Sequence, residues 1–188
     1  KNINLMDNSN FKEFKAVTIN NGVIEIHPYR ESEMIRNQEV VDDIYEIFGD
    51  LSQIPFNHEK FIDSKKKICT YSITSEWFRR SCYLHFVSYM PNQKIIGQIN
   101  ISPPVEEYYK FQKSLKNVWM IEYYLNKTFW NKGIMSSLIP AIIQSLNQQG
   151  ITNIGAVVDR LNTPSVRVLE KSGFVRIGQF DDLKDYYL

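Results

Sequence analysis

A short polar turn at Asn131, Lys132 and Gly133 carries the residues of this chain that are best suited to binding an anion. It separates an apolar run that ends at Leu125 from a long apolar stretch that starts at Ile134. The first turn of a helix presents unpaired N–H groups and the positive end of the helix dipole, which together attract phosphate. Gly133 allows close approach of the backbone to a ligand, and Asn131 is one of the few non-glycine residues that tolerate a left-handed conformation. An ordinary strand-to-helix turn has the same local pattern, so the turn alone leaves both interpretations open.

A second strand–turn–helix unit follows further along the chain, in the stretch NTPSVRVLEKSGF. Asn162 is expected to cap the helix, and Pro164 stands in its first turn. Val168 and Leu169 supply an apolar face, and Gly173 ends the helix. Capping explains these residues one by one. It does not explain why two such units occur together in this order.

The hydrophobic periodicity predicts the elements that position these turns. Strands are expected at about 23–29, 82–90, 94–102, 118–125, 151–159, 174–180 and 183–188, the second and third forming a hairpin. Helices are expected at about 31–48, from about 57 into the 70s, from Gly133 to about 149, and at 162–172. Residues 103–117 are interpreted as an exposed loop and residues 1–16 as a poorly anchored lead-in. We therefore predict one mixed α/β domain over residues 1–188, built around a central sheet.

Composition excludes several classes of function. With 188 residues, 43% hydrophobic content and a net charge of +1, the sequence is typical of a globular protein and gives no reason to expect nucleic acid or a membrane surface as partner. Cys69 and Cys82 lack disulfide-framework or zinc-site spacing, and the three histidines are scattered, so no metal site is expected. No stretch is long and apolar enough to span a bilayer, and the N-terminus lacks a secretory signal pattern, so we expect a cytoplasmic protein.

From about Val23 to the C-terminus, the chain resembles the GNAT superfamily of N-acetyltransferases, most closely the Rim-type branch that acetylates the N-termini of ribosomal proteins. The family signature N-x-x-S-x-x-x-L-E-K-x-G-F is matched by Asn162, Ser165, Leu169, Glu170, Lys171, Gly173 and Phe174. The cofactor loop, Q/R-x-x-G-x-G/A in the family and often W-G-K-G-Y-A in this branch, is Trp130-Asn131-Lys132-Gly133-Ile134-Met135 here. The resemblance implies an α/β fold of the α+β kind, with a mostly antiparallel sheet flanked by helices and a splayed strand pair at the cofactor cleft. It also implies acetyl-CoA as co-substrate.

The resemblance assigns roles to individual positions. The backbone amides of Trp130, Asn131, Lys132, Gly133, Ile134 and Met135 would hold the pyrophosphate of CoA, and Tyr123, Tyr124 and Leu125 would pair with the pantetheine arm. Asn162 would approach the cofactor arm. Ser165 would act as the general acid that reprotonates the CoA thiolate, since the tyrosine that serves elsewhere in the superfamily is replaced by Leu169.

Two positions depart from the pattern. Met135 replaces a small loop residue, so its side chain must crowd the cofactor or point away. Met120 stands where this branch usually has the glutamate that acts as general base. Strand residues alternate faces, so Glu122 lies on the same face as Met120, one step nearer the loop. We hypothesise that Glu122 is the base, and a glutamate that is merely solvated or paired with a lysine remains the alternative.

The resemblance implies an enzyme that transfers an acetyl group from acetyl-CoA to a primary amine by direct attack. The expected partners are acetyl-CoA and an amine acceptor, either a protein N-terminus or a small molecule, and a homodimer is left open. A relative that binds acyl-CoA without catalysis, as a sensor or interaction module, is the alternative that Met120 and Met135 favour. A protein that binds ATP or NAD at the same turn is disfavoured, because the chain lacks the glycine spacings of those sites.

Overall fold

The computed structural model describes residues 17–28, 38–48, 83–104 and 106–188. The strands are β1 Val17–Ile19, β2 Ile24–Pro28, β3 Tyr83–Tyr89, β4 Lys94–Ser102, β5 Trp119–Leu125, β6 Ile154–Asp159, β7 Arg176–Gln179 and β8 Lys184–Tyr187. The helices are α2 Gln38–Phe48, α5 Glu106–Tyr109, α6 Ile134–Gln148 and α7 Thr163–Lys171, with short 3-10 helices η2 Lys113–Leu115 and η3 Lys127–Phe129. The helix expected from about residue 57 lies outside the described residues, as do both cysteines and the lead-in at residues 1–16.

The strands form one mixed sheet in the order β1-β2-β3-β4-β5-β6-β8-β7. The β1–β2, β2–β3, β6–β8 and β7–β8 pairs are antiparallel, whereas β5 and β6 are parallel. The parallel register covers two residue pairs, Trp119↔Ile154 and Met120↔Gly155. This short register agrees with the splayed strand pair that the family resemblance implies. The expected fold class, a mostly antiparallel sheet flanked by helices, is confirmed.

By their internal contacts, the described residues group into two compact units. One consists of Ile101–Glu122 and Met135–Leu188, and the other of the described part of residues 17–100 together with Tyr123–Ile134. The division falls within β4 and within β5. The expectation of a single domain over residues 1–188 stays a prediction.

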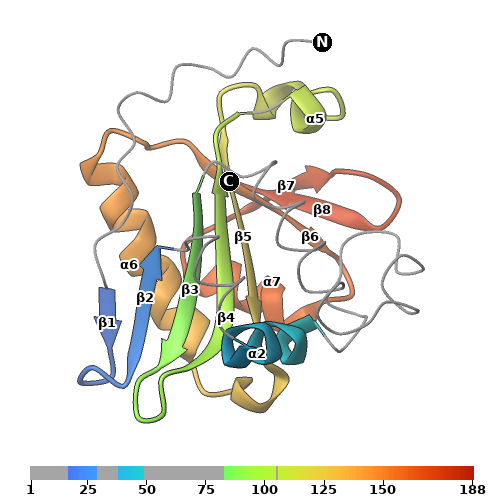
Figure 1. Ribbon diagram of the computed structural model, residues 1–188. Coiled ribbons are helices and arrows are strands. Elements are labelled where there is room, and N and C mark those ends of the chain that lie inside the picture. Colours follow the sequence, from blue (N-terminus) through green and yellow to red (C-terminus); the bar gives the residue numbers. More distant parts are fainter. Residues whose placement is uncertain (1–16, 29–37, 49–82, 105) are drawn as a thin grey trace. The chain divides into compact units, whose positions relative to one another are not determined.

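Figure 1 shows the elements β1, β2, β3 and α2 of one unit; local turn chemistry and side-chain anchors fix them. Asn20 and Asn21 connect β1 to β2 with φ angles of 52° and 55°, a conformation that asparagine tolerates better than most residues. Helix α2 is tied to the start of β4 by its acidic side chains. The Ile95 N–H donates to Asp43 Oδ2 at 3.0 Å, and Lys94 Nζ pairs with Glu46 Oε2 at 2.6 Å.

In the other unit, α6 has one face buried along its whole length. Leu138, Ile139, Ile142 and Leu146 are all 0% exposed, at the spacing expected for one face of a helix. Pro140 lies on the exposed side of the helix and removes one backbone N–H there. The apolar stretch of the sequence therefore folds as predicted, since the expected helix from Gly133 to about 149 is observed as α6.

The segment 103–117 differs from the exposed loop that we predicted, because it contains α5 and η2. Leu115 is 1% exposed, the Gln112 Nε2 amide donates to Gln179 O at 2.8 Å, and Ser114 Oγ donates to the Tyr186 hydroxyl at 3.3 Å. These contacts join the segment to the β7–β8 hairpin. Two prolines followed by a four-residue helix leave no helical periodicity to detect, so long-range packing rather than local pattern determines this structure.

Candidate functional site

The turn before α6 has the backbone conformation expected of an anion-binding loop. Asn131 and Gly133 have φ angles of 61° and 73°, so both adopt the left-handed conformation. Within the described residues, the backbone N–H groups from Asn131 to Ile134 donate to no protein acceptor outside α6. The N–H of Trp130, in contrast, already donates to Lys127 O at 3.1 Å. The amides that remain for a ligand therefore begin at Asn131, one residue later than the family signature implies.

Asn126 fixes the start of this turn, and the sequence did not single it out. Its side chain is 4% exposed, and its Oδ1 accepts from Thr128 N and Thr128 Oγ1 at 3.0 and 2.8 Å. Its N–H donates to Ile96 O at 2.6 Å, and its Nδ2 donates to Glu46 Oε2 at 3.1 Å. An asparagine immediately after a strand is a recognisable turn signal. Its partners on α2 and β4 are too distant in sequence to be inferred from it.

Aromatic side chains hold the rest of the turn. The Trp130 indole Nε1 donates to Leu125 O at 2.8 Å, which ties the turn back to the end of β5. The Phe129 ring packs against Tyr89 of β3 with centroids 5.4 Å apart. These anchors restrain the backbone just before Asn131, and α6 begins at Ile134 directly after Gly133, so the left-handed residues lie on a pre-organised loop.

The turn is also electropositive. Lys132 Nζ lies 5.2 Å from the Phe129 ring centroid, and Lys127 Nζ lies 5.9 Å from that of Trp130. A cavity of ≈ 370 Å³ opens beside the turn, lined by Asn20, Val23, Ile24, Tyr89, Phe129, Lys132 and Ile134. Exposed amides and two ammonium groups in one place favour an anionic ligand such as a phosphate.

Residues Tyr123 to Leu125, expected to pair with a pantetheine arm, lie against a glycine of β4. A Cβ built on Gly97 would stand 2.8 Å from Tyr124 O, 3.2 Å from Val87 Cβ and 3.3 Å from Leu125 Cδ1. Real Cβ atoms essentially never lie closer than 3.0 Å to another heavy atom, as this one would to Tyr124 O. Gly97 is therefore the residue that allows the close approach of β4 to this part of β5.

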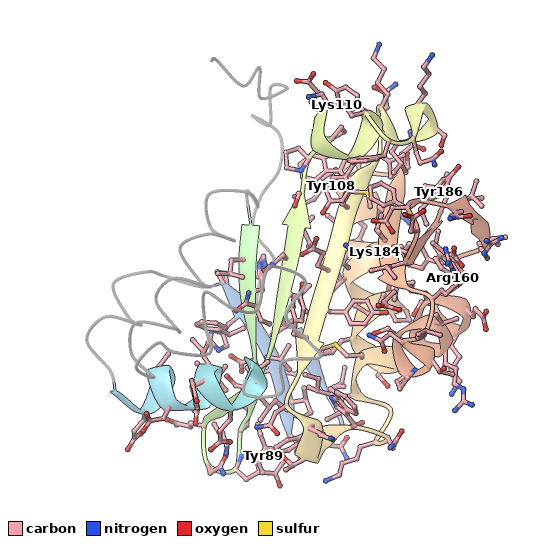
Figure 2. The ribbon with its side chains drawn as sticks, turned by 90° about the vertical axis from the view of Figure 1, so that its right-hand side faces the viewer. Tyr89, Tyr108, Lys110, Arg160, Lys184 and Tyr186 are labelled. Atoms are coloured by element: carbon pink, nitrogen blue, oxygen red, sulfur yellow. The ribbon has the colours of Figure 1, made fainter. Side chains whose placement is uncertain are left out.

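Glu122 is held by a tyrosine from α5. The Tyr108 hydroxyl donates to Glu122 Oε1 at 2.7 Å, and both side chains are half-buried. Tyr108 also packs against the buried cluster of Leu115, Val118, Met120 and Tyr186, which fixes its ring. Figure 2 labels Tyr108 and Tyr186. The carboxylate of the expected base is thus oriented by a residue on the segment that the sequence analysis took for a loop.

The two methionines that depart from the family pattern are both buried. Met120 is 2% exposed and belongs to the cluster just described, and Met135 is 5% exposed. The expectation that the Met135 side chain either crowds the cofactor or points away from it stays a prediction. Met120 cannot act as a base, and its surroundings are apolar.

Helix α7 begins as the sequence predicts. The Asn162 side chain caps it by accepting from the Ser165 N–H at 3.3 Å, and Pro164 stands in the first turn. Asn162 is exposed and Ser165 is half-buried. The N-cap prediction for Asn162 is confirmed, while the roles of Asn162 toward the cofactor and of Ser165 as an acid stay predictions.

Two kinds of feature are absent from the residues that the structure describes. In that part of the chain, no three histidine, cysteine, aspartate or glutamate side chains come together in a way that could hold a metal ion. None of the helices in the same ranges combines the length and hydropathy needed to cross a bilayer.

The comparisons with known proteins agree with the motifs. Residues 33–175 match the family model described as "Acetyltransferase (GNAT) domain". The fold is similar to that of a ribosomal-protein-S5-alanine acetyltransferase from Vibrio fischeri, at 16% identity and a TM-score of 0.62, covering 93% of this chain and 94% of that one. RimL, a ribosomal L7/L12 alpha-N-protein acetyltransferase solved in complex with coenzyme A, gives 13% identity and a TM-score of 0.66, with 92% and 96% covered. A GNAT-family acetyltransferase from Bacillus anthracis is 18% identical to this chain, with a TM-score of 0.59. The alignment covers 87% of this chain and 91% of that one.

No curated protein matches the sequence. The structural likenesses are below 25% identity and establish the fold, whereas the family model covers well over half of the 188 residues. The chain therefore belongs to the GNAT acetyltransferase family.

Proposed function

We propose that this protein is an acetyl-CoA-dependent N-acetyltransferase that acetylates a primary amine, either a protein N-terminus or a small molecule. One observation carries the cofactor half of this proposal. In a chain of the acetyltransferase family, Asn131 and Gly133 both adopt positive φ angles beside backbone amides that donate to no acceptor outside α6 among the described residues. The residues from Asn131 to Met135 bind the pyrophosphate, and the strand segment from Tyr123 to Leu125 lies along the pantetheine arm.

The acceptor chemistry is assigned to two side chains. Glu122 accepts a proton from the amine as its nitrogen attacks the thioester carbon, and the C–S bond breaks as the C–N bond forms. Ser165 donates a proton to the departing sulfur. An N-terminal amine has a reference pKa of about 8, so a modest base suffices to deliver it uncharged near neutral pH. The hydrogen bond from Tyr108 supports this role for Glu122, because it orients the carboxylate.

Thermal-shift measurements with acetyl-CoA, CoA and ATP side by side test the cofactor half. Acetyl-CoA and CoA should raise the Tm in a concentration-dependent way, because a ligand that binds only the folded state stabilises it. ATP should give a smaller shift, since it lacks the pantetheine arm. Stabilisation by ATP with none from acetyl-CoA would rule out the proposed cofactor.

Turnover of a Glu122→Gln variant tests the catalytic half. General bases typically contribute about 10²–10⁴-fold, so kcat should fall by that order with CoA affinity unchanged. Tyr108→Phe is the matched variant, because it removes one hydroxyl and keeps the carboxylate. We expect a smaller loss, about tenfold, from a base that is present but less well oriented. Unchanged turnover in Glu122→Gln would remove Glu122 from the mechanism.

A non-catalytic acyl-CoA-binding protein, acting as a sensor or interaction module, is the second candidate. The observation that favours it is Met120, which is buried in an apolar cluster at the position of the family glutamate. The two candidates differ in one result. The enzyme acetylates at least some amines in a broad screen of peptides and small amines, whereas the binder takes up acetyl-CoA and acetylates none.

A further inference from the structure

An aromatic side chain on the segment after α5 is exposed to solvent although it belongs to a row of packed rings. Phe111 is 62% exposed. The centroid of its ring lies 5.3 Å from that of Phe180, and the Phe180 centroid lies 6.1 Å from that of Tyr108. A single exposed apolar side chain is common on protein surfaces and requires no explanation. A row of three rings with one end in solvent differs from that case, because neighbouring rings extend the apolar surface beyond one residue.

The three rings are held in place by the fold around them. Tyr108 and Phe180 both pack against the buried cluster described above. The turn that carries Phe111 is tied to the β7–β8 hairpin next to it, because Gln112 Nε2 donates to Gln179 O at 2.8 Å. Rings that are already fixed can bind an apolar side chain without a large loss of conformational entropy.

The inner end of the row is the tyrosine that orients the proposed base. The Tyr108 hydroxyl donates to Glu122 Oε1 at 2.7 Å, and the three rings and Glu122 all belong to one compact unit. Two ring-to-ring contacts therefore separate Tyr108 from the exposed end of the row. Each of these spacings corresponds to about two residues of an extended peptide, which advances by about 3.3 Å per residue. A peptide whose amine meets Glu122 can thus reach Phe180 or Phe111 with its second, third or fourth side chain.

We propose that Phe111 and Phe180 form a binding surface for an apolar side chain at the second, third or fourth position of a peptide acceptor. This inference rests on the proposed function, which brings a free amine to Glu122, and it selects the protein N-terminus from the two acceptor classes given there. An apolar side chain that covers Phe111 removes its ring from water, and the gain in affinity grows with the area covered. A small amine ends before it reaches this ring and gains nothing from it.

The test uses the full chain and a set of tetrapeptide amides that have a free N-terminal alanine. The other three positions are glycine, and leucine or serine replaces one glycine at a time. Equilibrium dialysis with CoA present measures the Kd of each peptide, and mass spectrometry quantifies the bound peptide, so this readout does not require turnover. Acetyl transfer from acetyl-CoA to each peptide is measured separately.

Leucine at one of the three positions should lower the Kd about five- to tenfold relative to serine at the same position. In Phe111→Ser this preference should fall below about twofold, whereas Phe111→Leu, which keeps an apolar side chain, should retain most of it. Because Phe111 is exposed, neither substitution should change the Tm by more than about 3 °C. The position that carries the preference gives the register of the peptide on the surface.

Val175→Ala is the matched control, because Val175 is 64% exposed, close to the value for Phe111, and precedes β7 at the end opposite Phe180. It should leave the leucine preference unchanged. Equal binding of the leucine and serine peptides at all three positions would overturn the inference, as would a preference that Phe111→Ser retains or a failure of every peptide to bind. Failure of the proposed function is a different result, namely that the preference and its loss in Phe111→Ser are observed while no peptide is acetylated.

Discussion

The stability of this protein should fall as the pH is lowered from about 7 to about 5, because a histidine is buried in β3. His85 is 0% exposed. Desolvation, with a smaller contribution from the charge of His27, lowers the pKa of His85 from 6.5 to about 4. Since the pKa is lower in the folded state, the unfolded chain binds the proton more tightly. Stability is therefore lost as the pH falls through 6.5 toward about 4 and shows no further loss from this group below that.

The size of the effect follows from the two pKa values. At pH 7 the group is neutral in the folded state and mostly neutral in the unfolded state, so it has only a small influence on the free energy of unfolding. At pH 5 the unfolded state is mostly protonated at this group while the folded state remains mostly neutral. The pKa difference then corresponds to a loss of about 2 kcal/mol of unfolding free energy between these two conditions.

Urea unfolding, followed by tryptophan fluorescence at several pH values, measures how steeply the free energy of unfolding changes with pH. This dependence is the slope compared below. Other groups titrate in the same range, so the comparison is with His85→Gln, which has similar size and no charge. Between pH 7 and pH 5 the His85→Gln variant should lose about 2 kcal/mol less unfolding free energy than the unmodified protein, whatever its stability at pH 7. His27→Gln is the control, because it removes a histidine and leaves the burial of His85 in place, so most of the slope should remain. If His85→Gln keeps the full slope, desolvation of His85 does not determine the acid sensitivity.

Three further predictions concern single residues. Gly97→Ala should lower the stability by about 1–3 kcal/mol and weaken CoA binding, because the added Cβ would lie 2.8 Å from Tyr124 O; an unchanged urea midpoint would contradict this close packing. Asn131→Ala should weaken CoA binding and cost about 1 kcal/mol at a φ of 61°, whereas Asn131→Gly should retain both properties, as calorimetry and urea unfolding can establish. Asp185→Asn should lower the Tm at neutral pH, because Arg176 binds the carboxylate at 2.8 Å and lowers the pKa of Asp185; the difference should vanish as the pH falls through that lowered pKa.

The regular elements with strong periodicity were predictable from the sequence, and the reason is local. The apolar residues of α6 recur at helical spacing, so its bounds differ from the expected range by about one residue at each end. Asn131 and Gly133 could be expected at positive φ because their residue types tolerate it. The N-cap role of Asn162 follows in the same way from its type and from Pro164 two residues later.

The features that were missed depend on partners far away in sequence. Asn126 has an ordinary turn signal, but its importance comes from Glu46 and Ile96, which no local pattern relates to it. Polar residues that alternate with apolar ones along a strand are typical of a solvated face, yet Gln98 and Asn100 are both 0% exposed. Burial of a polar strand face depends on what packs over it, and a sequence pattern does not contain that information.

The displacement of the acidic residue from position 120 to position 122 has a physical explanation that neither residue gives alone. Met120 is 2% exposed in a cluster with Leu115, Val118 and Tyr186, so a glutamate there would be a charge buried among mostly apolar side chains. Two residues along the same face, the side chain leaves the cluster and is half-buried beside the Tyr108 hydroxyl. Burying a carboxylate costs less free energy at position 122, because there it is partly solvated and hydrogen-bonded. In the segment 106–115, Leu115 packs in the cluster that buries position 120, and Tyr108 donates the hydrogen bond to Glu122. The apolar cluster and the orientation of Glu122 therefore depend on the same segment.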